Sequence, residues 1–272
     1  MAARGSKSLP AGGNAPLDAL MVTTLRQGNQ IMPVTAQRVP ILKDNYAWLL
    51  RESTTGAVAI VDPAEGPPII AAIEAAGGRL DLILLTHHHA DHIAATDDVR
   101  ARFPCPVVGA AADSHRLPKL DIAVKEGDTV KFGNASARII ETPGHTIGQI
   151  NYFFADGEIL LSGDTLFSLG CGRLIEGTAD QMFSSLRKLA ALPGGTQVCC
   201  GHEYTESNGR FALSVDPDNR ALQARMERVL AARAAGQATV PSPMSEELAA
   251  NPFLTAATVA DFADRRSKKD RF

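Results

Sequence analysis

The sequence lacks the features that mark membrane and nucleic-acid-binding proteins. Its uninterrupted apolar stretches, such as Leu82 to Leu85, are far shorter than the ~20 residues that a membrane span needs. Its formal net charge is only −3, so no overall positive field would attract nucleic acid. The hydrophobic content of 45% and charged content of 21% are those of an ordinary globular protein. We therefore expect neither a membrane nor a nucleic acid as a partner.

Cysteine is scarce, and its spacing does not indicate a disulfide framework or a closed structural metal site. The four cysteines are Cys105, Cys171 and the adjacent Cys199 and Cys200, and they form no C-x-x-C pair. Cys171 lies between two glycines, and we expect it to pack in a tight turn. The simpler interpretation is that the protein works in a reducing compartment, so we expect it to be cytoplasmic. We also expect a monomer.

Residues 1–31 are expected to form a poorly ordered extension. They show no apolar periodicity and lack the apolar region of a secretory signal. Their single acidic residue would also suit an organellar transit peptide, but with three basic residues this is the weaker alternative. Deleting the extension should leave activity and melting temperature unchanged.

Residues 32–202 alternate between strand and helix signals, which predicts an α/β domain. Residues 46–50 and 57–61 flank a polar turn and predict a hairpin, with Asp62 as a turn residue after its second strand. Further strands are expected at 82–85, 107, 129–132, 137–141, 150–154, 159–161 and 197–200, and helices at 67–78, 93–103 and 180–191.

Residues 203–272 are expected to form a small helical domain, because the strand signals stop after His202. A helix opens at residues 216–218 and ends at Gly236, and more helix follows near Glu246 and Ala256. The apolar residues of the first helix are expected to form one buried face: Leu222, Met226, Val229 and Leu230.

Four apolar strands end in a small or turn residue followed by a side chain that can bind a metal. These side chains are His87, His145, Asp164 and His202. Ligand sites in α/β proteins lie just beyond the carboxyl ends of strands, so these residues are expected to converge. Gly144, Gly163 and Gly201 precede three of them, which suits close backbone approach at a crowded centre.

The densest group of candidate ligands is the segment THHHADH. Alternate residues of an extended chain face the same side, so His87, His89 and Asp91 point together while His88 points away. His92 follows where the chain turns into a helix that can return it to the group. His88, like the distant His115, is therefore expected to be an ordinary polar residue.

Seven donors are too many for one tetrahedral metal ion. The set is His87, His89, Asp91, His92, His145, Asp164 and His202. It suits two ions that share one carboxylate, at the ~3.5–4 Å spacing of two-metal hydrolases. Imidazole and carboxylate ligands accept zinc, with iron or manganese as alternatives.

The motifs THHHADH, GHT, GDTLF and GHEYT resemble the metallo-β-lactamase superfamily, and specifically its glyoxalase II (hydroxyacylglutathione hydrolase) family. The segments PILKDNYAWLL, GCGRLIEGTADQM and RRSKKDRF extend the resemblance over nearly all of residues 32–272. The resemblance implies an αββα sandwich of two mixed sheets with a small C-terminal helical domain that binds substrate.

The resemblance also implies the ligand sets and the reaction. One metal would be held by His87, His89 and His145 and the other by Asp91, His92 and His202, with Asp164 bridging. A metal-bridging hydroxide, with Asp91 and Asp164 as catalytic residues, would hydrolyse S-D-lactoylglutathione to D-lactate and glutathione. This reaction belongs to methylglyoxal detoxification.

By the same resemblance, four residues would bind the glutathione part of the substrate: Arg173, Tyr204, Arg266 and Lys269. Arg266 and Lys269 are three apart and would share a helix face, whereas Arg265 and Lys268 are expected to be solvated. Some family members carry a tyrosine where this chain has Ile175, so one hydrogen bond to the substrate is missing here.

Three other functions compete with thioester hydrolysis. The first is a persulfide dioxygenase of the same fold, in which His87, His145 and Asp164 would hold one iron. The terminal RRSKKDRF has no part in that pattern. The second is a nuclease or lactonase, and the near-neutral charge weakens the nuclease form. The third, a non-enzymatic binding module, leaves seven convergent ligands without a purpose.

Overall fold

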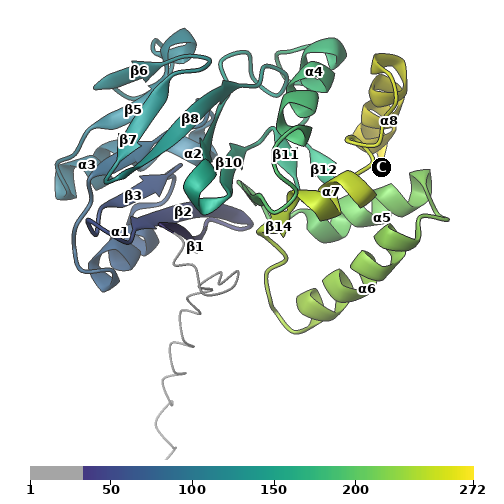
Figure 1. Cartoon of the computed structure of the whole chain (residues 1–272), viewed down its shortest axis with the longest axis horizontal. Helices are drawn as coiled ribbons and strands as arrows, with labels where there is room; N and C mark the ends of the chain where they lie inside the picture. The colour runs from purple at the N-terminus through teal and green to yellow at the C-terminus, as the bar shows by residue number, and fades with distance from the viewer. Residues whose placement is uncertain (1–32) are drawn as a thin grey trace, which may run out of the picture.

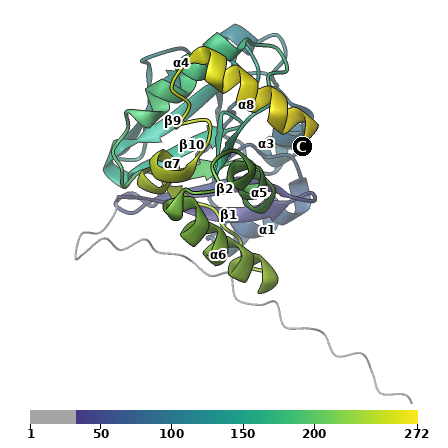
Figure 2. The same ribbon diagram turned by 90° about the vertical axis from the view of Figure 1, so that its right-hand side faces the viewer.

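Two β-sheets packed face to face form the centre of the molecule. The computed structural model describes residues 33–272, and Figures 1 and 2 show the sheets between covering helices. Sheet 1 is mixed, because β1 to β3 run antiparallel and β3 to β6 run parallel. Its strands, in sheet order, are β1 (Val34–Ile41), β2 (Asn45–Glu52), β3 (Val58–Val61), β4 (Leu82–Leu84), β5 (Val107–Ala110) and β6 (Ile122–Val124).

Sheet 2 is also mixed. Its strands β10 and β13 run parallel, and the other neighbours run antiparallel. In sheet order they are β14 (Ser242–Pro243), β13 (Gln197–Cys200), β10 (Ile159–Gly163), β9 (Ile150–Phe154), β8 (Ala135–Glu141) and β7 (Thr129–Phe132). A separate short hairpin joins β11 (Leu166–Phe167) to β12 (Gly170–Cys171).

An apolar core fills the space between the two sheets. Trp48 and Leu84 of sheet 1 pack there with Phe132 and Tyr152 of sheet 2, and all four are almost fully buried. Helices α1 (Gly66–Ala75) and α3 (Thr96–Arg102) cover the outer face of sheet 1 through a second apolar cluster, and α4 (Ala179–Ala190) covers sheet 2 through a third. The predicted αββα sandwich and the predicted β2–β3 hairpin are confirmed.

Three helices begin at residues whose side chains accept hydrogen bonds from free backbone N–H groups: α4, α6 (Arg220–Ala234) and α8 (Val259–Arg271). The Thr178 side chain accepts a hydrogen bond from Gln181 N, and the Gln181 side chain accepts one from Thr178 N, so α4 starts with a capping box. Asn219 caps α6 and Thr258 caps α8 by a single side-chain hydrogen bond each, accepted from Leu222 N and Asp261 N. The remaining helices are α2 (Ala90–Ile93), α5 (Thr205–Val215) and α7 (Met244–Ala250).

The prediction of one helix over residues 93–103 is wrong, because the chain breaks into α2 and α3. The break falls at Ala95, whose N–H donates to Pro63 O at 3.0 Å instead of continuing the helix. The short α2 therefore carries Asp91 and His92 as a separate turn.

The C-terminal part contains features that the sequence patterns did not predict. β14 pairs with β13, so strand structure does not stop after His202. Helix α5 precedes the first helix that was predicted there. Leu230 is 41% exposed and lies outside the buried face of α6, because at 3.6 residues per turn it lies about 80° around the helix from Leu222.

No helix among residues 33–272 is long and apolar enough to cross a membrane. The predicted extension, residues 1–31, lies outside the described residues.

Candidate metal centre

The predicted ligands come together at one edge of the sandwich, where strands of both sheets end. His87 follows β4, His145 follows β8, Asp164 follows β10 directly, and His202 lies two residues after β13. His89 caps the start of α2, whose first turn carries Asp91 and His92. All seven predicted donors are therefore delivered by strand ends or by the short turn of α2.

Three imidazole rings form the first ligand group. His89 Nδ1 lies 3.2 Å from His87 Nε2 and 3.0 Å from His145 Nε2. His87 and His145 are buried, and His89 is partly exposed on the open side. These three nitrogens can hold one metal ion.

A second group joins one carboxylate to two imidazoles. Asp91 Oδ2 lies 3.8 Å from His92 Nε2 and 3.5 Å from His202 Nε2. These three atoms can also hold one ion. Asn45 Nδ2 donates to Asp91 Oδ2 at 3.0 Å and so fixes the carboxylate of this group.

The carboxylate of Asp164 lies between the two groups. Its Oδ1 is 3.3 Å from His92 Nε2, and its Oδ2 is 3.3 Å from His202 Nε2 and 3.5 Å from His145 Nε2. Each oxygen thus faces the second group, and one of them also faces the first. This is the position that a bridging ligand needs.

The geometry fits divalent metal ions. Ligand atoms about 2.0–2.1 Å from a tetrahedral ion lie roughly 3.4 Å from one another, close to the spacings found here. His92 Nε2 and Asp164 Oδ1 are buried and have no hydrogen-bond partner. Buried polar atoms are normally satisfied, so these two atoms need a partner that a cation would supply.

Burial and mutual contact also set the protonation of these residues. Burial, with the neighbouring imidazoles, holds the pKa of His87 well below its usual value, so its ring is neutral and able to bind a metal. Burial alone would raise the pKa of Asp164, but His92 and His202 outweigh it and hold that pKa well below its usual range. Asp164 is therefore ionised.

The ring nitrogens that face away from the centre are held by hydrogen bonds. His202 Nδ1 lies 3.2 Å from Asp44 Oδ1, and His145 Nδ1 lies 2.9 Å from the backbone oxygen of Arg173. His87 Nδ1 lies 3.0 Å from Thr86 Oγ1. Such partners fix the tautomer and orientation of metal-binding histidines.

Asp62 holds His92 in the same way, and the sequence prediction of a turn role alone was incomplete. It is buried and has a positive φ of 52°. Its Oδ2 accepts from His92 Nδ1 at 3.0 Å, and its two oxygens accept from the N–H and Oγ1 of Thr86. The signal was present in the sequence, because Asp62 follows the apolar strand β3 as Asp164 follows β10.

Of the three predicted glycines, only Gly201 lets the backbone come close to the predicted ligands. A Cβ atom at Gly201 would lie 2.6 Å from both Asp164 Oδ1 and a carbon of His92. A Cβ atom at Gly144 would meet Met182, and one at Gly163 would meet Thr86 and Gln149. His88 points away from the centre, as predicted, and its Nδ1 lies 3.1 Å from Asp113. His115 is exposed.

The residues predicted to bind glutathione lie in three different environments. Tyr204 stacks on the His202 ring at 4.6 Å, and Arg173 is 72% exposed. Lys269 Nζ donates to the backbone oxygen and Oγ of Ser207. Arg266 is buried, and its Nη1 donates to Cys171 O at 2.9 Å. Their role in binding substrate stays a prediction, as do the ligand roles of the seven donors.

Arg265 and Lys268 were both predicted to be solvated, but only Lys268 is. Lys268 is exposed and pairs with Asp264. Arg265 is 19% exposed and donates to Asp261 and to Pro252 O, so its predicted solvation is wrong. Arg265 lies in the middle of α8, and its side chain reaches back to the start of that helix and to the preceding loop. Ile175 is exposed.

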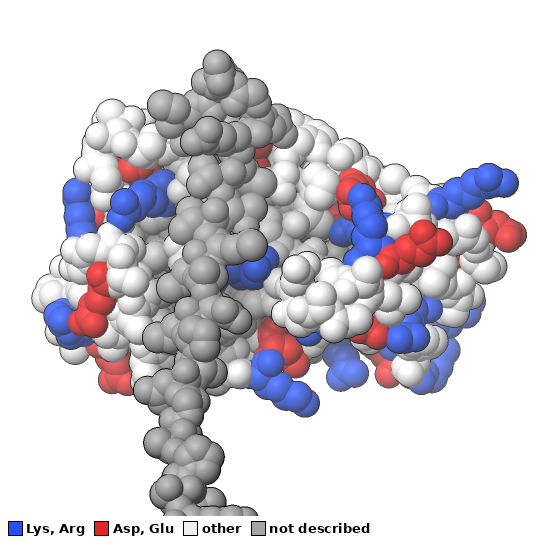
Figure 3. Space-filling view, turned by 90° about the horizontal axis from the view of Figure 1, so that it is seen from below, with Lys and Arg blue, Asp and Glu red and all other residues white. Residues whose placement is uncertain are grey.

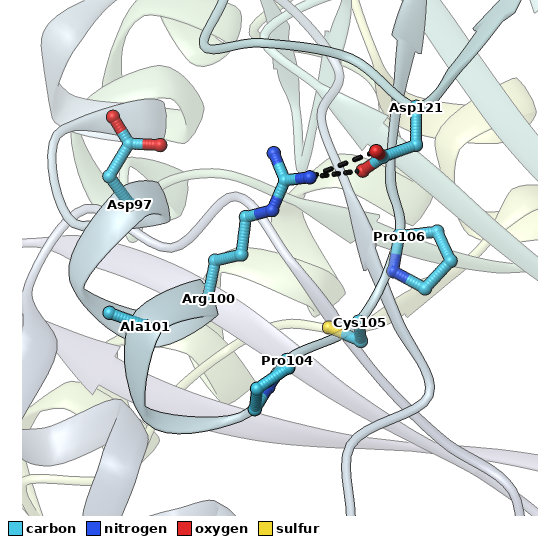
Figure 4. A pocket seen from close by; sticks show the side chains of 7 residues that line it. All are labelled: Asp97, Arg100, Ala101, Pro104, Cys105, Pro106 and Asp121. Carbon is cyan, nitrogen blue, oxygen red and sulfur yellow. Dashed lines mark hydrogen bonds and ion pairs between the residues drawn. The ribbon is translucent and has the colours of Figure 1, made fainter.

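A surface hollow elsewhere on the molecule has no comparable group of ligands. In Figure 4, Arg100 pairs with Asp121 across the hollow, beside Cys105. Burial raises the pKa of the Cys105 thiol to about 11. The thiol is therefore protonated at neutral pH and is a poor nucleophile. The buried Cys171, Cys199 and Cys200 are packed, as predicted.

Comparison with known proteins places this site in a family. The family described as "Metallo-beta-lactamase superfamily" matches residues 42–202, and that described as "Hydroxyacylglutathione hydrolase C-terminus" matches residues 203–272. The superfamily match and the His/Asp groups together support divalent metal binding by this chain.

Similar proteins cover most of the chain. A hydroxyacylglutathione hydrolase of Acidiphilium cryptum is 55% identical over 88% of this chain and 97% of its own. One of Methylococcus capsulatus is 49% identical over 86% of this chain and 97% of its own. The solved structure of TTHA1623 in a di-iron-bound form is 28% identical, with a TM-score of 0.53 over 62% of this chain and 91% of its own. The chain therefore belongs to the metallo-β-lactamase superfamily and, within it, to the hydroxyacylglutathione hydrolase (glyoxalase II) family.

Proposed function

We propose that this chain is a thioester hydrolase that converts S-D-lactoylglutathione and water to D-lactate and glutathione, a step of methylglyoxal detoxification. The observation that carries the proposal is the pair of three-ligand groups on either side of the Asp164 carboxylate. The relatives named hydroxyacylglutathione hydrolase, similar over most of the chain, support the same reaction.

We propose two divalent ions in this centre, zinc or alternatively iron or manganese. His87, His89 and His145 would hold one, Asp91, His92 and His202 the other, and Asp164 both. When bound, such ions activate water and stabilise negative charge on a carbonyl oxygen. The di-iron form of TTHA1623 supports the number of two.

The chain's own residues supply the rest of the chemistry. Asp91 and Asp164 are the proposed catalytic carboxylates, because their negative charges would balance the positive charge of the metal ions at the reacting centre. Hydrogen bonds fix the Asp91 carboxylate and the rings of His92 and His202 around them. The leaving thiol has a pKa near ~8.5, so it can depart as a thiolate without a dedicated acid. This property favours a thioester over an amide or a phosphodiester as the substrate.

Charge at the edge of α8 favours an anionic substrate. Arg173 and Arg266 approach the same carboxylate, Asp270, at 3.8 and 2.9 Å. Burial, with both arginines nearby, lowers the pKa of Lys269. Two arginines thus share one carboxylate and Lys269 adds a third cation nearby, which leaves positive charge for the carboxylates of glutathione. We propose that Arg173, Arg266 and Lys269, with the Tyr204 hydroxyl, bind them.

Lys269→Ala should raise the KM for glutathione thioesters about tenfold and change kcat little. The reason is that an anchor remote from the reacting bond holds substrate and transition state equally, and one charge-assisted contact contributes about 1.5–3 kcal/mol. Steady-state kinetics checks this. Lys268→Ala is the matched control, because Lys268 is exposed and pairs with Asp264. Equal KM values for the two variants would remove Lys269 from the substrate site.

The KM should also rise with pH through about 8. Burial, with Arg266 and Arg173 nearby, lowers the pKa of Lys269 to about 8. The ammonium is therefore present below this pH and is lost above it, and the contact with an anion is lost with it. Measuring KM from pH 7 to 9.5 tests this. Lys269→Arg should flatten the rise, because arginine stays charged. A rise that persists in Lys269→Arg would come from another group.

Two assays on one sample separate the proposed function from its rival. Purified protein is tested for S-D-lactoylglutathione hydrolysis and for oxidation of glutathione persulfide, with metal analysis alongside. We expect hydrolysis and close to two metal ions per chain. Persulfide oxidation with one iron, and no hydrolysis, would establish the dioxygenase instead.

We also propose that residues 32–202 form the catalytic domain and 203–272 the substrate-binding domain of a cytoplasmic monomer. The two family matches meet at residue 202, which supports this division. On the face seen in Figure 3, basic and acidic side chains are intermixed over the described residues, in keeping with a small-molecule substrate.

A further inference from the structure

The β11–β12 hairpin connects the proposed bridging ligand to a proposed substrate anchor. It begins two residues after Asp164 and ends two residues before Arg173. Its base closes on the ligand, because Gly172 N donates to Thr165 O at 3.2 Å and a Cβ at Gly172 would lie 2.0 Å from Asp164 O. A shift of the hairpin would therefore move the backbone that carries the Asp164 carboxylate.

Side chains from the helical part of the chain hold the backbone of this hairpin. Figure 1 shows β11 and β12 beside α5 and α7. Asn251 Nδ2 donates to Phe167 O at 3.1 Å and to Gly170 O at 3.0 Å. Asn208 Nδ2 donates to Ser168 O at 3.1 Å. Three carbonyls of the hairpin are thus bound by residues 40 to 84 positions away in the sequence.

Glu247 holds the tip of the hairpin. Its Oε2 accepts from Leu169 N at 2.8 Å and from Asn251 Nδ2 at 3.0 Å. Leu169 has a positive φ of 56°, a conformation that a leucine rarely adopts without support. The hydrogen bond from its N–H to Glu247 supplies part of that support.

Arg225 neutralises the Glu247 carboxylate inside the protein. Glu247 is 0% exposed, and its Oε1 accepts from Arg225 Nη2 at 2.7 Å and from Ser242 Oγ at 2.6 Å. Arg225 Nη2 also donates to Ser168 Oγ of the hairpin at 2.8 Å. A buried ion pair is a weak source of stability, whereas buried hydrogen bonds such as those to Leu169 N and Ser168 Oγ fix geometry. These contacts are therefore better explained by the placement of the hairpin than by stability.

We propose that Asn251 and Glu247, braced by Arg225, are positioning residues that hold the hairpin so that the Asp164 carboxylate stays between the two ligand groups. They act through the backbone of residues 165–172 and touch neither substrate nor ligand atoms. The expected effect of these residues on turnover rests on the proposed function, whereas their expected effect on metal binding does not.

Asn251→Ala tests the proposal, with Asn219→Ala as its control. Asn251→Ala removes the bonds to Phe167 O and Gly170 O. Asn219→Ala removes the cap of α6 and a hydrogen bond to Ala249 O, so it lowers the melting temperature without removing a hydrogen bond to the hairpin. Each variant is measured well below its melting temperature for metal content after dialysis, for the visible spectrum of the Co²⁺-loaded protein, and for kcat and KM.

We expect Asn251→Ala to lose metal, to alter the Co²⁺ spectrum and to lower kcat about tenfold or more, with KM changed less than about twofold. Asn219→Ala should keep the wild-type metal content, spectrum and kcat. Wild-type values in Asn251→Ala would overturn the proposal, and so would equal losses in both variants.

A second variant covers the case in which Asn251→Ala does not fold. Asn208→Ala removes one hairpin bond and should shift the same readouts in the same direction by a smaller amount, and wild-type readouts there would overturn the proposal. If the wild-type protein hydrolyses no S-D-lactoylglutathione, the proposed function fails. Metal content and the Co²⁺ spectrum would still decide the role of the hairpin.

Discussion

Asp164→Asn is expected to lower both the metal content and the turnover of the enzyme, the latter by at least about 100-fold. Losing a residue that only orients a ligand already costs roughly 10- to 100-fold, and loss of a shared ligand should cost no less. The carboxylate of Asp164 faces His92, His145 and His202 at 3.3 to 3.5 Å. An amide there has no charge, and its NH₂ group would point at an imidazole nitrogen meant for a metal.

The measurement is metal content by elemental analysis together with thioester hydrolysis. Asp113→Asn is the control, because Asp113 is also buried beside a histidine, with its Oδ2 3.1 Å from His88 Nδ1, yet belongs to neither ligand group. That variant should keep its metals. One tightly held ion, with full activity in Asp164→Asn, would refute the shared-carboxylate scheme.

The sequence predicted the ligand-bearing strand ends well because their signal is local. A run of apolar residues, then a glycine or threonine, then histidine or aspartate can be seen within six residues, and β4 and β10 both follow it. The strand-end rule for α/β sheets then brings such ends together without knowledge of the contacts. The alternation of strand and helix patterns predicted an α/β domain, whereas the αββα sandwich was implied by the resemblance to the metallo-β-lactamase superfamily.

The sequence did not predict the hydrogen bonds that orient the ligands, because these join residues far apart in the chain. Asp62 and His92 are 30 positions apart, and Arg225 and Ser168 are 57 apart. No periodicity links such pairs. Arg265 was mistaken for a solvated residue for the same reason, because its partner Pro252 O lies on a preceding loop. A helix face can be derived from spacing, but what packs against it cannot.

Asp62→Asn should lower metal affinity and turnover roughly 10- to 100-fold with little change in melting temperature. Asparagine keeps the shape of the side chain and tolerates the positive φ of this position. Its oxygen can still accept from the Thr86 N–H, which Oδ1 of Asp62 accepts at 2.8 Å. Its NH₂ group would then replace Oδ2, the atom that accepts from His92 Nδ1 at 3.0 Å.

That exchange would reverse the hydrogen bond to His92. An NH₂ donor requires Nδ1 to accept, which places the ring proton on Nε2, the nitrogen that faces Asp164 and Asp91. A protonated Nε2 cannot bind a metal, so binding would require the ring to break this hydrogen bond first. The loss should therefore appear as weaker metal affinity in a competition with a chelator, and full turnover should return only at high metal concentration.

Asp44→Asn is the matched control, because Asp44 holds His202 Nδ1 in the same manner at 3.2 Å. Its side chain is 37% exposed, against 4% for Asp62, so water can replace the lost acceptor. We expect a smaller effect there, within about fivefold, because an exposed hydrogen bond is partly exchanged for one to solvent. Wild-type metal affinity in Asp62→Asn, or equal losses in the two variants, would show that burial of the acceptor does not set the tautomer of the ligand.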